Sequence, residues 1–365
     1  MTFAASSDSS AGPLTGLRVV ELTGIGPGPH CAMLLADLGA EVLRIDRPGG
    51  NGWPNPVVDR GRHSIELDLH APAGRERCLA ALDKADILIE GYRPCVMERL
   101  GLGPDVVLAR NPKLVYGRMT GWGQTGPRSA RVGHDINFIA LTGALAAMGK
   151  ADEPPLPPLN LVGDFGGGSM MLAFGIMAAL WERERSGLGQ VIDAAIIDGT
   201  SSLMALLVGA HAAGAISLER DRNLLAGVAP FYRCYRCADG KDVAIGAIEP
   251  PFYAELIRRM GAPSHLVDEQ GATEKWGAHC QILEAIFLQR TRAEWQELLD
   301  DHDVCFTPVL TVGEAMVDPH IVSRGGYRDV GPCTQNAPVP RFSRTPGAIG
   351  KAGDGEKLLQ KWSQG

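Results

Sequence analysis

The sequence lacks an excess of basic residues. It has 35 Lys and Arg against 42 Asp and Glu, a formal net charge of −7 with histidine counted as neutral. Nucleic-acid-binding domains usually carry a basic excess that neutralises phosphates, so we expect no nucleic-acid partner. The overall field of an acidic chain does not attract anions either. Any anionic ligand must therefore be held by local basic side chains or by helix N-termini.

The sequence also has little that indicates a membrane, an oxidising compartment or a metal. Residues 1–10 have neither a basic start nor an apolar run, so we expect no secretory signal, and the C-terminus carries no peroxisomal address. The longest apolar stretches, 170–181 and 203–218, are short or interrupted, which favours buried helices over membrane spans. The eight cysteines are scattered, and Cys234 and Cys237 form a CxxC without a second pair at zinc-site spacing. We expect a cytoplasmic chain with reduced thiols, no membrane partner and no metal.

Two familiar motifs are incomplete. The glycine turn from Gly24 and the later Asp46 imitate a dinucleotide-binding fingerprint, but one GxGxxG register ends on Pro29 and the other on Cys31. Asp164 opens an Asp-Phe-Gly triplet, but the other kinase motifs are absent. The sequence therefore favours neither a nicotinamide cofactor nor a kinase.

Strand-like and helix-like patterns alternate in the first part of the chain. A strand, a glycine turn, a helix and a strand follow one another, and two more strand-like runs continue the pattern: 17–22, 30–38, 41–45, 85–90 and 114–119. This order predicts parallel strands joined by right-handed crossovers. We expect a large α/β domain over residues 1–200, built on an open Rossmann-like parallel sheet.

The pattern changes after about residue 225. Residues 232–237 and 242–247 alternate around Asp239-Gly240, which predicts a hairpin, and Thr291-Arg-Ala-Glu294 has the spacing of a helix capping box. We predict a smaller α/β domain after a helical linker. The expected boundaries are 201–224 for the linker, 225–320 for the small domain and 321–365 for a C-terminal segment.

His134 and Asp164 are the first candidates for chemistry. His134 follows the glycine-rich stretch 120–127 and opens an apolar helix, although a lone histidine is more often structural. Asp164 precedes the glycines 166–168 and another apolar helix, where an aspartate is usually an N-cap. Consecutive glycines cost helix stability, but they let backbone N–H groups approach a ligand oxygen. We therefore expect two proton carriers beside an oxyanion site.

Four further charged residues are candidates for binding or orientation. Arg47, Arg93 and Arg99 follow expected strands, at the edge where open α/β sheets bind ligands. Each alone is typical of a solvated surface, but together they fit a phosphate-bearing ligand. Glu249 follows the hairpin and is either a surface carboxylate or a group that orients an imidazole.

Several motifs together resemble a known family. Three stretches resemble the family III CoA-transferase superfamily: 35–46, 90–94 and 121–127. Residues 133–137 with 163–168 resemble its α-methylacyl-CoA racemase branch. The resemblance extends in order from residue 14 to residue 344. It implies an interlocked homodimer, in which the large domain of one subunit meets the small domain of the other, and a C-terminal segment that returns to the large domain.

The resemblance also implies an activity and a site. His134 and Asp164 would be the two acid/base residues, and Glu249 would hydrogen-bond His134. A racemase needs one base to remove an α-proton and a second group to return it to the opposite face. The expected reaction interconverts (2R)- and (2S)-2-methylacyl-CoA thioesters through an enolate, with no cofactor because CoA belongs to the substrate. The implied CoA site comprises Arg47, Leu67, Asp68, Leu69, His70, Gly91, Tyr92, Arg93, Arg99, Gly133 and Asp135.

Two alternatives stay open at this point. The first is CoA transfer to a free acid, with Asp164 as a nucleophile that forms an acyl anhydride; transferases of this superfamily lack the histidine. The second is a non-catalytic acyl-CoA-binding protein. His70 stands where the family resembled usually has lysine, and Cys95 stands where that family usually has glycine. Both departures lie in the half of the chain that the resemblance assigns to CoA binding, so they bear on the affinity for CoA rather than on the reaction. Bile-acid-like, sterol, branched fatty and arylpropionyl chains all stay open as the acyl group.

Overall fold

The computed structural model describes residues 12–331 and 333–364, which form two compact units. Unit 1 comprises the described residues up to 142, residues 158–203 and those from 325 on; unit 2 comprises residues 143–157 and 204–324. Residues 1–10, where the sequence predicts no secretory signal, lie outside the described residues. The short segment 143–157 thus groups with residues that follow much later in the chain.

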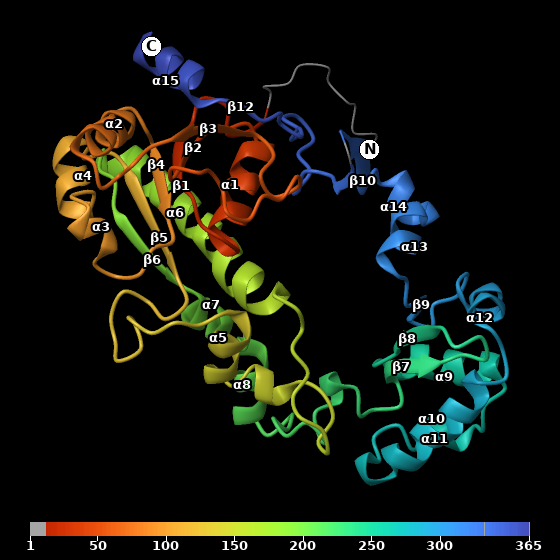
Figure 1. Ribbon diagram of the computed structural model, residues 1–365. Helices are drawn as coiled ribbons and strands as arrows, with labels where there is room; N and C mark the ends of the chain where they lie inside the picture. Colours follow the sequence, from red (N-terminus) through yellow and green to blue (C-terminus); the bar gives the residue numbers. More distant parts are fainter. Residues whose placement is uncertain (1–11, 332, 365) are drawn as a thin grey trace. The chain divides into compact units, whose positions relative to one another are not determined.

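Unit 1 is built on a seven-stranded sheet in which every neighbouring pair is parallel (Figure 1). The strand order is β12-β3-β2-β1-β4-β5-β6. The strands are β1 (Arg18–Leu22), β2 (Glu41–Asp46), β3 (Arg62–Glu66), β4 (Ile87–Glu90), β5 (Val115–Thr120), β6 (Val191–Ala195) and β12 (Gly353–Asp354). The predicted open parallel sheet is confirmed.

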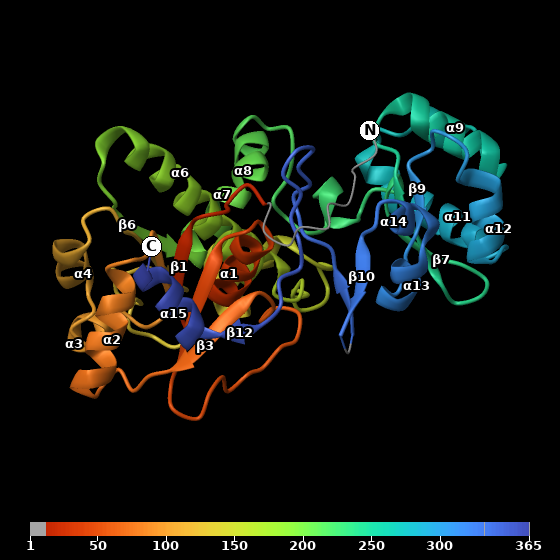
Figure 2. The same ribbon diagram turned by 90° about the horizontal axis from the view of Figure 1, so that it is seen from above.

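The central strands are apolar on both faces because helices cover both faces. Adjacent residues of one strand point to opposite faces, so Val19 and Val20 of β1 belong to different core clusters. One cluster packs under α2, α3, α4 and α15, and the other under α1, α5 and α6 (Figures 1 and 2). These helices are α1 (Pro27–Asp37), α2 (Pro72–Leu82), α3 (Val96–Arg99), α4 (Pro104–Arg110), α5 (Asp135–Leu141), α6 (Met170–Ser186) and α15 (Gly355–Gln364).

The C-terminal segment completes the sheet of unit 1. Strand β12 pairs with β3, and the buried Trp362 donates from Nε1 to Glu41 Oε2 at 2.7 Å. Before β12, the strands β10 (Tyr327–Val330) and β11 (Cys333–Asn336) form an antiparallel pair. Buried Arg60 forms an ion pair with Asp37 and donates to the carbonyl of Asn336 at 2.8 Å. Long-range contacts therefore hold the chain's end against its beginning.

Unit 2 is a smaller α/β body with the antiparallel sheet β7-β8-β9. The predicted hairpin and capping box are both confirmed, since β7 pairs with β8 and the Thr291 side chain accepts from the backbone N–H of Glu294. The strands are β7 (Tyr232–Arg236), β8 (Asp242–Gly246) and β9 (Phe306–Pro308). The helices are α8 (Ala205–Ala212), α9 (Pro250–Met260), α10 (His265–Asp268), α11 (Trp276–Phe287), α12 (Arg292–Leu299), α13 (Val312–Val317) and α14 (Pro319–Ser323).

A continuous helical segment runs from Leu161 to Ser186. Its first part is a π-helix, η2 (Leu161–Ser169), which leads directly into α6. With 26 residues it is long enough, and over an 18-residue window apolar enough, to cross a membrane by length and composition alone. Leu172 and Ile176 are buried in the core cluster on one face of the sheet. Core helices of water-soluble proteins meet the same criterion, so this segment is weak evidence for a membrane span.

The backbone at Cys95 adopts a conformation that favours glycine. Cys95 directly precedes α3 with φ at +66°, in the left-handed region. A side chain costs energy in this conformation because Cβ approaches the following carbonyl, whereas glycine adopts it freely. The cysteine is therefore a source of local backbone strain directly after Arg93 and Pro94.

We predict that Cys95→Gly raises the free energy of unfolding by about 1 kcal/mol, because it removes this steric cost. Urea denaturation followed by circular dichroism measures the change. Cys234→Gly is the matched control: Cys234 is also exposed but lies in strand β7, where glycine is expected to destabilise. A loss of stability in Cys95→Gly would contradict the assignment of strain.

Candidate active site

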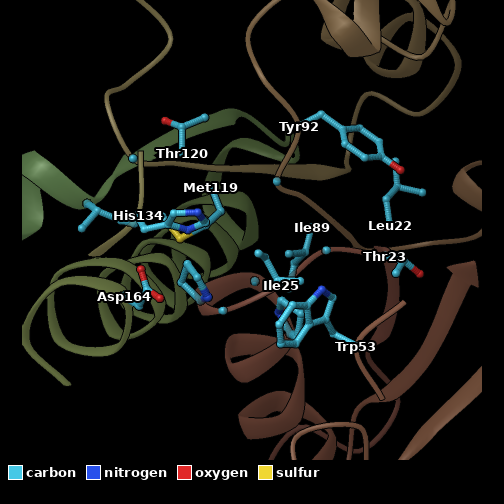
Figure 3. Close-up of a pocket in the computed structure, with 18 of the residues that line it drawn as sticks. Leu22, Thr23, Ile25, Trp53, Ile89, Tyr92, Met119, Thr120, His134 and Asp164 are labelled. Carbon is cyan, nitrogen blue, oxygen red and sulfur yellow. The ribbon is translucent and has the colours of Figure 1, made fainter. Parts of the chain in front are cut away.

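A pocket of about 560 Å³ lies at the carboxyl ends of the parallel strands of unit 1 (Figure 3). Leu22 closes β1 and Thr120 closes β5, and both line the pocket, as does Gly91 directly after β4. This is the edge at which open α/β sheets bind ligands, because the loops after the strands diverge there. The topology of the sheet thus positions the site.

His134 enters the pocket from the start of α5. It is the N-cap residue with extended backbone, and its N–H donates to Asn137 Oδ1 at 3.0 Å. This hydrogen bond fixes the backbone and leaves the exposed imidazole at the pocket wall. Figure 3 shows the side chains of His134 and Asp164 at the same end of the pocket.

Asp164 enters the pocket from a π-helix, which differs from the sequence-based expectation. The N-cap interpretation is wrong, because Asp164 is the fourth residue of η2 rather than the residue before a helix. The N–H of Phe165 donates to the carbonyl of Asn160 at 3.2 Å, five residues earlier. The wide turns of a π-helix often mark functional sites, and here they carry the pocket carboxylate.

The glycines 166–168 do not open a helix, so the expected oxyanion site at their N–H groups is wrong. Their amides lie inside η2, where the helix's own carbonyls accept hydrogen bonds. The glycines serve close packing instead. A Cβ on Gly167 would lie 2.5 Å from Thr200 Oγ1, and one on Gly199 would lie 1.9 Å from the carbonyl oxygen of Gly167. Helix α7 (Ile196–Leu203) therefore packs against η2 at backbone distance.

Asp135 is the most important contact of Asp164 that sequence reasoning missed. Its buried carboxylate accepts a hydrogen bond from the backbone N–H of Asp164 through Oδ1 at 2.7 Å, while Oδ2 is buried without a hydrogen-bond partner. A Cβ on Gly163 would lie 2.3 Å from Oδ1, so glycine before Asp164 is the sequence feature that reflects this contact. The resemblance placed the backbone near His134, including Asp135, at the CoA site, which stays a prediction; the Asp135 side chain faces the backbone of η2.

The surroundings raise the pKa of Asp164 to about 6. Burial is the main cause, because a desolvated carboxylate favours its neutral form, and the like charge of Asp135 adds to it. A hydrogen bond from Asn160 and the nearby His134 lower the pKa in part. A carboxyl group that titrates near neutral pH can both accept and return a proton.

A second histidine holds η2 in place. His30 of α1 stacks on Phe165 with ring centroids 4.3 Å apart, and its Nδ1 lies 2.7 Å from Ser169 Oγ. Burial lowers the pKa of His30, and the charges of two nearby arginines lower it further. Its neutral imidazole thus fixes Phe165, the neighbour of Asp164. No local pattern in the sequence indicated this contact between segments far apart in the chain.

Buried Glu90 fixes the corner after β4. Arg118 donates to it from Nε at 2.9 Å, and the backbone N–H of Tyr92 donates to its other oxygen at 2.7 Å. Burial raises the pKa of Glu90 to about 7, although Tyr92 and Arg118 lower it in part. The hydrogen bonds of Glu90 to Arg118 and to the Tyr92 backbone therefore position Gly91 and Tyr92 at the pocket wall.

The structure brings together part of the predicted CoA site. Arg47, Gly91, Tyr92 and Gly133 line the pocket with His134. Arg93 lines an adjoining hollow that shares four of these residues, and Arg131 lies there as well. Arg131 is a basic residue that the sequence analysis did not single out.

Other predicted residues lie elsewhere and stay predictions. Leu67 and Leu69 are buried in the core, while Asp68 Oδ1 accepts from the N–H of His70 at 2.9 Å. Arg99 is exposed on α3.

Glu249 is the exposed N-cap residue of α9. It belongs to unit 2, whereas His134 belongs to unit 1.

The chain belongs to CoA-transferase family III, which matches residues 14–353. It is 44% identical to the alpha-methylacyl-CoA racemase of Mus musculus, over 91% of this chain and 87% of the mouse protein. It is 42% identical to the alpha-methylacyl-CoA racemase of Homo sapiens, over 91% and 90% of the two chains. A CAIB/BAIF family protein from Brucella suis has a similar structure, with a TM-score of 0.83, 26% identity and coverage of 97% and 100%. The family resemblance read from the motifs is confirmed.

We predict that Asp135→Asn lowers the pKa of Asp164 from about 6, by up to about one pH unit, because it removes a like charge while an amide oxygen can still accept from the Asp164 N–H. The pKa should stay above its ordinary value, since burial persists. Carboxyl ¹³C NMR titration measures it. The control is Asp198→Asn, an exposed aspartate of α7, which should leave the Asp164 titration unchanged. An unshifted titration in Asp135→Asn would refute the charge effect.

Proposed function

We propose that this protein is an isomerase that interconverts (2R)- and (2S)-2-methylacyl-CoA thioesters by exchange of the α-proton. The observation that carries the proposal is the pair His134 and Asp164, which two separate elements bring to one pocket wall, with the pKa of Asp164 raised to about 6. The names of the mouse and human relatives support the same reaction.

In each direction of the reaction, one of the two side chains removes the α-proton and the other delivers a proton. In one direction Asp164 removes the α-proton as a carboxylate, and protonated His134 delivers a proton to the opposite face of the carbon. In the other direction the roles reverse. A raised pKa suits Asp164 to both roles, because neither of its protonation states is rare near neutral pH.

The enolate oxygen needs hydrogen-bond donors, and the glycines of η2 do not provide them. The first turn of α5 is the better candidate, because the opening N–H groups of a helix have no carbonyl within the helix to bond. Asp135 and Ile136 open this turn directly after His134. We assign the stabilisation of the enolate to these two amides.

Local arginines bind the CoA phosphates in this proposal. Arg47 lines the pocket, and Arg93 and Arg131 line the adjoining hollow. Because the chain carries a net charge of −7, these guanidinium groups rather than the overall field must attract the nucleotide. Residues 67–70 and Arg99 complete the proposed CoA site farther along the sheet edge.

We further propose a homodimer, in which Glu249 of the partner subunit hydrogen-bonds His134. Unit 1 leaves apolar side chains of α6 uncovered, with Phe174 73% exposed and Trp181 70% exposed. Apolar patches of this kind are typical of interaction sites. A second copy of the chain is the proposed partner, as the family resemblance implies.

We place the protein in the cytoplasm. All eight cysteines are free thiols, and Cys31 and Cys78 among them are buried. Burial raises the pKa of the Cys78 thiol to about 12, which keeps it protonated and unreactive. Free thiols are typical of a reducing compartment.

We predict that the enzyme incorporates deuterium at the α-carbon of a 2-methylacyl-CoA in D₂O. His134→Ala and Asp164→Asn should each slow this exchange by about 10²–10⁴-fold, because each removes one proton carrier. Mass spectrometry of the recovered thioester measures exchange, and Asp198→Asn is the control. Transfer of CoA to an added free acid, with a hydroxylamine-trapped Asp164 adduct, would favour the transferase instead. Absence of both reactions would favour a binding protein.

We predict that inactive His134→Ala and Glu249→Gln subunits complement each other when they are mixed and refolded together. If Glu249 acts across the interface, each mixed dimer has one intact site, and about a quarter of the wild-type exchange rate returns. If Glu249 acts within its own subunit, no activity returns. Light scattering of each variant checks that both remain dimers.

A further inference from the structure

Unit 2 contains a cluster of two imidazoles and one carboxylate that the proposed reaction does not use. His265 opens the short helix α10, Glu269 directly follows the helix, and His279 lies on α11. One ligand atom from each of the three residues lies within 4.8 Å of the others. Within residues 12–331 and 333–364, this is the one such group of three potential metal ligands.

We propose that His265, Glu269 and His279 form a binding site for a divalent transition metal of the Zn²⁺ type. Imidazole nitrogen and carboxylate oxygen are common ligands of zinc, and two histidines with one carboxylate leave a fourth position for water or another ligand. The site belongs to unit 2, whereas the candidate active-site pocket belongs to unit 1.

The distances agree with tetrahedral coordination. His279 Nε2 lies 3.1 Å from Glu269 Oε2. Bonds of about 2.0–2.1 Å at tetrahedral angles place two ligand atoms about 3.3 Å apart, so this pair already has the required separation. The rings of His265 and His279 are 6.0 Å apart at 69°, and His265 is exposed, so its side chain can rotate to close the site.

The surroundings of the cluster restrict how the metal binds. The ammonium group of Lys275 pairs with Glu269 Oε1, which leaves Oε2 as a single ligand atom next to His279. His279 is 3% exposed, so packing holds its ring beside Glu269, and its Nδ1 is buried without a hydrogen-bond partner. On binding, the metal takes Nε2 and the ring proton moves to Nδ1.

The metal would connect α10 to α11 across the loop between them. Trp276, the first residue of α11, donates from Nε1 to the carbonyl of Gln270 in this loop, and Gln270 Nε2 donates to the carbonyl of Ile248, both at 2.9 Å. Ile248 directly precedes Glu249. A metal at Glu269 would therefore stabilise the segment that supports Glu249, while the metal itself takes no part in proton transfer.

The test titrates EDTA-treated full-length protein with Co²⁺, which absorbs visible light when four-coordinate, and then with Zn²⁺. We expect one saturable site per chain, displacement of Co²⁺ by Zn²⁺, and a rise in melting temperature with Zn²⁺. His265→Ala and Glu269→Gln should each weaken binding by at least about tenfold. Both positions are partly or fully exposed, so the fold should survive, and circular dichroism checks this.

His302→Ala is the matched control, because His302 is an exposed histidine of unit 2 outside the cluster. Its binding should equal that of the wild type. Absence of a saturable site in the wild type, or equal binding by wild type, His265→Ala and Glu269→Gln, would overturn the proposal. These readouts are spectra and melting temperatures, so they are independent of the racemase proposal.

Discussion

The hydrogen bond from the Asp164 backbone to the Asp135 carboxylate is the interaction on which the site depends. It joins the start of α5 to the π-helix η2, and so connects the two segments that carry His134 and Asp164. The contact needs a glycine at position 163, because a Cβ there would meet the carboxylate oxygen. One buried carboxylate thereby sets both the relative position of His134 and Asp164 and part of the electrostatic field at Asp164.

Close helix packing is the second constraint. Gly167 and Gly199 let η2 and α7 touch along their backbones, and the stacking of His30 on Phe165 holds η2 from α1. Together with the Asp135 contact from α5, three helices thus pack against η2. The glycines beside Asp164 consequently allow close packing of helices rather than opening a helix.

The sequence contained enough to predict the elements that depend on local patterns. The apolar runs that became β1, β4 and β5 are short and buried on both faces, so a parallel sheet was readable from them. The sequence also singled out His134 and Asp164, because glycine-rich segments flank both residues, and the structure places both at one pocket. The π-helix, the orphaned oxygen of Asp135 and the grouping of residues 143–157 with unit 2 depend on contacts between distant segments, and a local pattern does not contain them.

The raised pKa of Asp164 means that its ionised form costs stability near neutral pH. Its ordinary value is 3.8, and in the folded protein the value is about 6. The folded state therefore binds the proton more tightly than the unfolded chain does. The resulting stabilisation is fully present below pH 3.8 and is lost as the pH rises through about 6, so near neutral pH the protein holds a buried carboxylate at an energetic disadvantage. Asp135 increases that disadvantage through its charge while its hydrogen bond holds the backbone in place. The same residue thus destabilises the ionised carboxylate and supports the helix that carries it.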